Sequence, residues 1–228
     1  MDTLQVKSDL HTHTLYSHGK GTPEENVLAA IKLGLERIAI SEHASGHIFY
    51  GVRGEKLAAL RRETDRLARK YASDIEVLMG YECNLTAFGE CDAPVDRSMF
   101  DVLLLAYHKG VFARDALTLR CAAESFRIGH ADPVRVSEAL LAAADKYRID
   151  IFSHPCTYVR ADIPTLAKGA AELGVLLELN GSHTDLTPDD VRLAASYGAR
   201  FCVNSDAHTP ERVGDFKKGL DIAEAAGI

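Results

Sequence analysis

The sequence predicts an α/β fold in which parallel strands alternate with helices. Two observations support this: short apolar runs recur along the chain, and amphipathic stretches separate most of them. Several of the runs are almost continuously apolar, as expected for strands covered on both faces. A chain of 228 residues suits one domain of this kind, so we expect a single domain over residues 1–228.

Seven segments have the pattern of buried strands. They lie at residues 4–10, 37–43, 75–82, 101–108, 149–155, 175–180 and 200–206. An alternating strand and helix order implies a parallel sheet with helices outside it. Seven strands favour a closed barrel near the TIM type but one unit short, and a doubly wound open sheet is the alternative.

Six amphipathic stretches are expected to form the outer helices. They lie at residues 22–34, 54–72, 132–147, 163–174, 187–198 and 209–227. The first has a full set of boundary signals: Thr22 as N-cap, Pro23 at the first helical position, Glu25 closing a capping box and Gly34 as the stop.

Composition and charge limit the function classes. The net charge is −7, which disfavours partners that need a basic surface, such as long nucleic acids and membranes. The five cysteines are odd in number and form no CxxC motif, which indicates a reducing compartment. With no signal-peptide pattern and no apolar run near the roughly 18 residues of a membrane span, we expect a cytoplasmic protein.

Histidines and carboxylates collect at the predicted strand ends. The segment "SDLHTHTLYSH" alone holds three of the ten histidines. The C-terminal ends of parallel barrel strands meet on one face, so residues at those ends are expected to converge. A single histidine there is usually a capped or solvated group, but the joint pattern predicts a metal site. The set is His11, His13, His18, His43, Glu82, His108, His154, Asp206 and His208.

The ligand types indicate the metals and the chemistry. Imidazole suits zinc, iron and manganese, and a carboxylate can bridge two ions. Nine ligands exceed one tetrahedral site, so we expect two or three divalent ions. Such a centre would keep a positive charge in an acidic protein, which favours an anionic substrate such as a phosphate ester. A bridging water whose pKa falls towards ~7 would supply a metal-bound hydroxide as nucleophile. The prediction is hydrolysis of a phosphomonoester, with a phosphodiester as the neighbouring possibility.

Four motifs carry a resemblance to a known family. "DLHTH" (9–13), "SEH" (41–43), "GYE" (80–82) and "SDAH" (205–208) resemble the PHP (polymerase and histidinol phosphatase) family over essentially the whole chain. The chain is most similar to small single-domain phosphoesterases of the YcdX and histidinol-phosphate phosphatase type. The resemblance implies one PHP domain over residues 1–228 with a distorted (β/α)7 barrel.

The resemblance also implies how the metal ligands are shared. It places Glu82, Asp206 and His208 in catalysis. It implies a first ion held by His11, His13, Glu82 and Asp206, a second that shares Glu82 and takes His108 and His154, and a third held by His18, His43 and His208.

Further side chains are predicted near this centre. Four are candidates for substrate contact: Arg160, Asn180, Lys20 and Arg53. Two carboxylates beside ligands would orient imidazoles or make a structural bond: Asp9 and Glu42. Two histidines are expected in loops, with substrate contact left open: His47 and His183. His130 is expected at a helix start, and Cys83 and Cys156 are expected in packing roles.

Two alternatives remain. An amidohydrolase barrel also begins with HxH and ends with a strand-terminal aspartate; it would use Lys109, but leaves His18, Glu82 and His208 without a role. A PHP-type nuclease or exonuclease acting on oligonucleotides or nucleotides, or a module of a larger DNA polymerase-related system, would use the same metals. The acidic balance favours a small phosphorylated substrate over such a nucleic acid.

Overall fold

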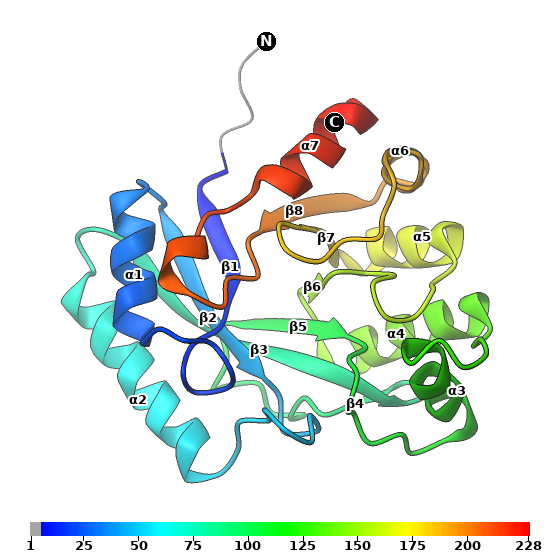
Figure 1. The fold of residues 1–228 in the computed structure, drawn as a ribbon, viewed down its shortest axis with the longest axis horizontal. Helices are drawn as coiled ribbons and strands as arrows, with labels where there is room; N and C mark the ends of the chain where they lie inside the picture. Colours follow the sequence, from blue (N-terminus) through cyan, green and yellow to red (C-terminus); the bar gives the residue numbers. More distant parts are fainter. Residues whose placement is uncertain (1–5) are drawn as a thin grey trace.

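The computed structural model describes residues 6–228. Its parallel strands follow the order β1-β2-β3-β5-β6-β7-β8 and curl into a nearly closed barrel with the helices outside (Figure 1). This confirms the predicted barrel over the open sheet. The strands are β1 (Ser8–Thr12), β2 (Arg37–His43), β3 (Glu76–Ala87), β5 (Val102–Ala106), β6 (Ile151–Phe152), β7 (Leu176–Asn180) and β8 (Arg200–Asn204). The first residues of the predicted strand at 4–10 lie outside the described part of the chain.

The first and last strands meet at the C-terminal end of the barrel. Leu10 N donates to Asn204 Oδ1 at 2.8 Å, and His13 N donates to Ala207 O at 2.7 Å. Thr12 and Ala207 form an isolated parallel bridge. The barrel is therefore closed by these contacts beside the motifs "DLHTH" and "SDAH", rather than by a full ladder between β1 and β8.

Strand β3 is longer than predicted. It continues past Glu82 to Ala87 and forms a hairpin with β4 (Glu90–Cys91). Glu82 therefore lies inside the strand, in register with His43 of β2 and Leu104 of β5. The extension was missed because its polar residues, such as Asn84, are buried and use their hydrogen bonds internally.

The predicted helices form around the barrel, with one division and one addition. They are α1 (Pro23–Lys32), α2 (Glu55–Lys70), α4 (Pro133–Tyr147), α5 (Ile163–Leu173), α6 (Pro188–Ser196) and α7 (Lys217–Ala226). The predicted capping box is present: Thr22 Oγ1 accepts from Glu25 N, and Glu25 accepts from Thr22 N. The last stretch divides into a short 3₁₀ helix, η1 (Pro210–Arg212), and α7, because Gly214 between them has a φ of 76°. Helix α3 (Ala116–Ser125) was not predicted.

The interior of the barrel changes from apolar to polar along the strands. Alternate residues of a strand share a face, and an apolar cluster joins Leu78, Leu104, Leu176 and Cys202 from four strands. Two or four residues later on the same faces stand polar side chains, such as Glu82 on β3. The apolar cluster therefore forms a floor below a polar centre at the C-terminal end. Within residues 6–228, no helix has the length and apolar character needed to cross a membrane.

Candidate metal centre

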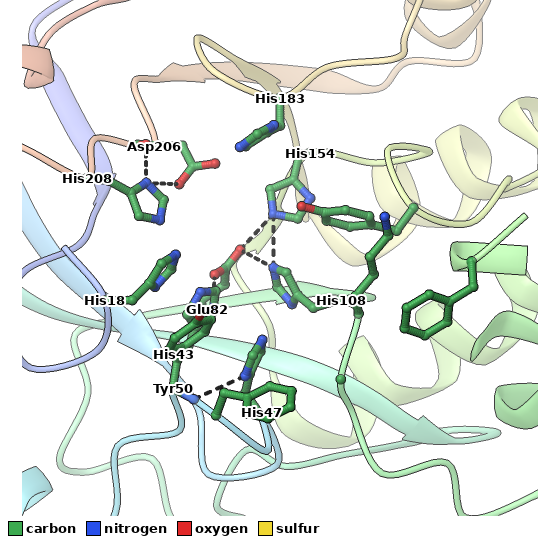
Figure 2. Close-up of a pocket in the computed structure, with 15 residues that line it drawn as sticks. His18, His43, His47, Tyr50, Glu82, His108, His154, His183, Asp206 and His208 are labelled. Atoms are coloured by element: carbon green, nitrogen blue, oxygen red, sulfur yellow. Dashed lines mark hydrogen bonds and ion pairs between the residues drawn. The ribbon is translucent and has the colours of Figure 1, made fainter. Parts of the chain in front are cut away.

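Glu82 lies in the middle of the predicted ligand set, fully buried, with His108 and His154 on one side (Figure 2). Its Oε1 lies 2.8 Å from His154 Nε2 and 3.1 Å from His108 Nε2. The same oxygen lies 3.2 Å from His11 Nε2. One carboxylate oxygen therefore faces three ring nitrogens from three different strand ends.

Asp206 and His13 stand on the other side of Glu82. The Nε2 atoms of His11 and His13 are 3.1 Å apart, and Asp206 Oδ1 lies 3.6 Å and 3.3 Å from them. Glu82 Oε2 lies 3.6 Å from His13 Nε2. Ligand atoms about 2.1 Å from a tetrahedral ion are roughly 3.4 Å from one another. His11, His13 and Asp206 therefore have the mutual spacing of ligands to one ion, with Glu82 beside them.

The orientation of two rings leaves lone pairs facing the centre. His11 Nδ1 lies 2.9 Å from Glu178 Oε1, and His108 Nδ1 lies 2.7 Å from Asn84 Oδ1. Both partners accept hydrogen bonds, so each ring donates from Nδ1 and, when neutral, presents the Nε2 lone pair to Glu82. Such an arrangement suits a cation at the centre.

Unpartnered buried atoms support the same conclusion. His43 Nδ1 and Glu82 Oε2 lie 2.9 Å apart but form no hydrogen bond, and neither has another partner among the described residues. Buried polar atoms are normally satisfied, so an unpaired nitrogen and oxygen facing each other fit a shared metal ligand. The donor set of imidazoles and carboxylates is also one that transition metals prefer.

The side chains can be grouped into four overlapping sets of ligand atoms within 4.8 Å of one another. These are His13 with His43 and His208; His11 with His13 and Glu82; His11 with His154 and Asp206; and His43 with Glu82 and His108. The first set differs from the partition implied by the resemblance, because His13 replaces His18. His18 is on the loop after β1, where its ring stacks on Tyr50 and His43 at centroid distances of 4.3 Å and 4.8 Å.

Electrostatics divides the rings into two kinds. Burial opposes protonation throughout, but for His13 the carboxylates of Asp206, Glu42 and Glu82 outweigh burial and raise its pKa to about 9. Burial lowers the pKa of His43 to about 4, and burial together with nearby His13 lowers that of His208 to about 4. His13 thus holds a proton that a divalent cation would replace. His43 and His208 are already neutral near pH 7, as metal ligation requires.

The two central carboxylates stay ionised despite their burial. Burial alone would raise the pKa of Glu82, but His108, His11 and His43 hold it well below its usual range. Burial is likewise outweighed at Asp206, whose pKa is held well below normal by His11 and His13. Both carboxylates therefore stay negatively charged at neutral pH, with the surrounding histidines as their counter-charges in the metal-free protein.

Glu178 of β7 is a buried carboxylate that sequence reasoning missed. Its Oε1 accepts from His11 Nδ1 and from Asn204 Nδ2 at 2.8 Å. Its Oε2 accepts from His154 N and from Asn180 Nδ2, both at 2.8 Å. Glu178 therefore positions two of the predicted ligands. The available signal was a charged residue inside the apolar run 175–180.

Asn180 does not occupy the predicted substrate-contact position. It is fully buried, its Nδ2 donates to Glu178 and to Asp206 Oδ2 at 3.3 Å, and its Oδ1 accepts from Ser182 N and His183 N. Its amide is used within the protein, so the prediction of substrate contact is corrected: Asn180 supports Asp206.

The three predicted basic contacts also lie outside the cavity above the donors. Arg160 has a side chain 66% exposed, near His130 and Glu124. Lys20 is exposed, and its backbone nitrogen donates to His208 O. Arg53 is exposed, with Nη1 3.4 Å from Ser45 O. The loops carry these side chains away from the centre, which sequence position alone could not indicate.

The two flanking carboxylates have different surroundings. Asp9 accepts from Ser205 N, Ser205 Oγ and Gly214 N, which is the structural bond that sequence left as its alternative. Glu42 accepts from Thr14 N and from the Thr14 and Ser17 hydroxyls. Its Oε2 also lies 3.8 Å from His13 Nδ1, so Glu42 supports the loop after β1 and influences one predicted ligand.

A cavity of about 340 Å³ opens above the donors. The loop histidines His47 and His183 line it, together with Tyr158 and Lys109. Lys109 Nζ lies 5.8 Å from the Tyr158 ring centroid and 5.9 Å from that of Phe126. The amidohydrolase alternative gives this lysine a role at the metals, but Glu82 occupies the middle of the donor cluster.

The remaining expectations concern residues away from the donors. His130 is exposed in the loop before α4, rather than at the helix start. Cys83 is buried, and its Sγ lies 3.6 Å from Tyr81 O. Cys156 is half-buried, with Sγ 3.9 Å from Ala161 O. Both cysteines have the surroundings of packing residues.

A seven-stranded parallel barrel with clustered imidazoles and carboxylates at its strand C-termini defines a metal-dependent hydrolase. Sequence comparison gives the family: the profile of the PHP domain matches residues 9–175. The chain belongs to the PHP domain family and is a metal-dependent phosphoesterase.

Two curated relatives are similar to the chain in sequence, and one solved structure is similar in fold. The chain is 28% identical to a probable phosphatase of Shewanella sp. strain ANA-3, over 97% of this chain and 84% of that protein. It is 26% identical to the DNA polymerase/3'-5' exonuclease PolX of Bacillus subtilis, over 96% of this chain but only 37% of PolX. The fold is similar to histidinol phosphate phosphatase of Lactococcus lactis, solved with zinc, L-histidinol and phosphate. The TM-score is 0.65 at 17% identity, over 97% and 94% of the two chains.

Proposed function

We propose that the chain hydrolyses a small phosphomonoester with two or three divalent ions. The observation that carries this proposal is the position of Glu82, whose buried carboxylate faces five ring nitrogens within 3.6 Å. The ligands proposed are His11, His13, His18, His43, Glu82, His108, His154, Asp206 and His208. Divalent ions at these residues would neutralise phosphate charge and acidify the attacking water.

The chain's own groups would prepare the site for this reaction. Glu178 and Asn84 hold His11 and His108 with Nε2 towards the centre. Glu82, Asp206 and His208 line the cavity, which supports their proposed catalytic roles. In the reaction, the oxygen of a water forms a bond to phosphorus and the ester P–O bond breaks. The released alcohol oxygen takes up a proton.

The metal content is a direct test. Imidazole-rich sites take zinc, iron or manganese, and the similar Lactococcus lactis enzyme was solved with zinc. Protein grown with all three metals should contain two to three ions per chain by elemental analysis. Fewer than one ion per chain would contradict the proposed ligand set.

The substrate size separates the proposal from its main alternative. The similarity to PolX keeps a nuclease or polymerase-associated role as the second candidate. The net charge of −7 favours a small substrate, since long nucleic acids need many salt-dependent phosphate contacts. We expect kcat/KM of the metal-loaded protein to be at least ~10-fold higher for a phosphomonoester than for a single strand of about 20 nucleotides. Measurements at about 50 and 200 mM salt test this, and a faster oligonucleotide at both would favour the nuclease.

A further inference from the structure

A second groove adjoins the cavity above the donors. It has a volume of about 340 Å³ and shares Lys109 and Tyr158 with that cavity. The centroid of the Tyr158 ring is 5.9 Å from the ring centroids of both His108 and His154. The groove therefore begins one aromatic ring away from the proposed ligands.

Positive charge is concentrated in this groove although the chain is acidic overall. Lys109, Arg127 and Arg160 line it, with Glu124 as the facing carboxylate. Glu124 accepts from Ala131 N at 2.7 Å and from Arg160 N at 3.1 Å, so its charge is already used to hold the backbone. The groove keeps a net positive charge.

Two of the three cations have no carboxylate partner. Within residues 6–228, no carboxylate forms an ion pair with Lys109 or Arg127, whereas Arg160 Nε pairs with Glu124 Oε1 at 3.6 Å. Arg160 Nη2 also donates to His130 Nδ1 at 3.2 Å. These groups keep donors that an anionic ligand could use.

The backbone conformation of Arg127 fixes the position of its side chain at the groove. Arg127 follows the end of α3 with a φ of 62°, a conformation that a side chain other than glycine adopts at some cost. An arginine in this position places a long cation at the groove where a glycine would be easier to accommodate. The conformation ends helix α3, because Ile128 N donates to Ala123 O at 2.8 Å and Arg127 N donates to Glu124 O at 2.7 Å, and this helix end fixes where Arg127 enters the groove.

We propose that this groove is a second phosphate subsite, so that the substrate carries a further phosphate group besides the one that is hydrolysed. The inference rests on the proposed function, because the scissile phosphate must lie at the donors. Arg127 and Arg160 would bind the second phosphate, since guanidinium groups match phosphate oxygens with paired hydrogen bonds. Lys109, shared by the two cavities, would lie between the two phosphates.

A matched substrate series tests this inference. The probes are the mono- and bisphosphates of linear diols from ethane-1,2-diol to hexane-1,6-diol, assayed with metal-loaded protein. We expect at least one bisphosphate to have a kcat/KM about tenfold or more above its monophosphate, mainly through a lower KM. The diol length that gives the highest ratio of bisphosphate to monophosphate kcat/KM would indicate the spacing between the two subsites.

Variants of the groove arginines test whether the groove causes the preference for bisphosphates over monophosphates. In Arg127→Ala/Arg160→Ala, we expect the ratio of bisphosphate to monophosphate kcat/KM to fall to near one. Arg120→Ala is the matched control, because it removes an exposed positive charge from α3 outside both cavities and should keep the ratio. If the double variant is unstable, the single variants Arg127→Gln and Arg160→Gln are measured instead. Each should lower the ratio, and their melting temperatures show whether they remain folded.

The outcomes separate the inference from the proposed function. Turnover of monophosphates without preference for any bisphosphate overturns the second subsite and leaves the proposed function in place. No turnover of either series overturns the proposed function and the inference with it. A short oligonucleotide that exceeds every diol bisphosphate would overturn the inference in favour of a groove that follows a nucleic-acid backbone.

Discussion

The two ends of the barrel both hold carboxylates at strand termini, but the partners of those carboxylates differ. At the N-terminal end, Asp150 Oδ2 accepts from Arg97 Nη2 at 2.6 Å and from Leu103 N at 2.8 Å. At the C-terminal end, Glu82 and Asp206 face imidazoles. A guanidinium is permanently charged, so Asp150 has a fixed counter-ion. An imidazole can lose its proton, so the carboxylates at the other end can exchange protons for a divalent cation.

Replacing the central carboxylate should have the largest effect. Glu82→Gln keeps the shape of the side chain but removes the charge that the surrounding ring nitrogens face. We expect a loss of metal content and a fall in kcat/KM of more than ~100-fold, beyond what the loss of an outer partner usually costs. Elemental analysis and phosphomonoester kinetics on the same samples measure both.

Two further variants test whether this effect belongs to the centre. Asp150→Asn at the opposite end should lower the free energy of unfolding but keep the metal content. Asn180→Ala should lose less metal and less activity than Glu82→Gln. Equal and mild losses at Glu82 and Asn180 would show that Glu82 does not bridge ions.

Removing the carboxylate behind the ligands should have a smaller effect. His11 Nδ1 donates to Oε1 of Glu178 and His154 N donates to Oε2, and Glu178→Gln replaces one of these two acceptor oxygens by an NH₂ donor. We expect metal affinity to fall by about 10–100-fold, as for other outer partners of metal-binding histidines. Competition with a chelator measures the affinity. Glu172→Gln, an exposed glutamate on α5, is the control, and an equal change there would contradict the role of Glu178.

The pH dependence of stability should give the smallest effect. In the metal-free protein, the pKa of His13 is raised from 6.5 to about 9 by its carboxylate neighbours, which outweigh burial. Its contribution to stability is fully present below pH ~6.5 and is lost as the pH rises through ~9. We expect the free energy of unfolding to fall by about 1–3 kcal/mol over this interval.

The metal-loaded protein is the comparison for this measurement. A coordinated imidazole is unprotonated, so the loaded protein should show little change between pH ~6.5 and ~9. Urea denaturation at several pH values measures both forms. Metal-free protein that becomes more stable over the same interval would show that His13 does not hold a proton there.

The sequence predicted the barrel because its strands are apolar runs and its helices carry strong start signals, as at Thr22. It predicted that the proposed ligands converge, because the strand ends of a parallel barrel must meet. It did not predict Glu178, since the partner of a buried carboxylate depends on which strands are neighbours. It missed helix α3, although Asp115 caps its first turn by accepting from Thr118 N at 2.8 Å.

The basic residues around the cavity show a further limit of what the sequence alone can predict. Arg160 follows His154 closely in sequence, yet the chain turns through Cys156 with a φ of 72°, and Arg160 lines the adjoining groove rather than the cavity above the donors. Lys109, directly after His108, lines the cavity instead. Loop direction depends on backbone conformations and tertiary contacts that residue spacing does not specify.

The contact between the first and last strands also sets an order of events during synthesis. His13 N pairs with Ala207 O, so ligands from both ends of the described chain come together only when β8 has formed. At roughly 5–20 residues per second, a ribosome needs on the order of ten seconds or more to produce the residues between them. During that interval the histidines of "DLHTH" have emerged without Asp206 and His208. The complete set of proposed ligands therefore forms late, and is available only after Asp206 and His208 have been synthesised.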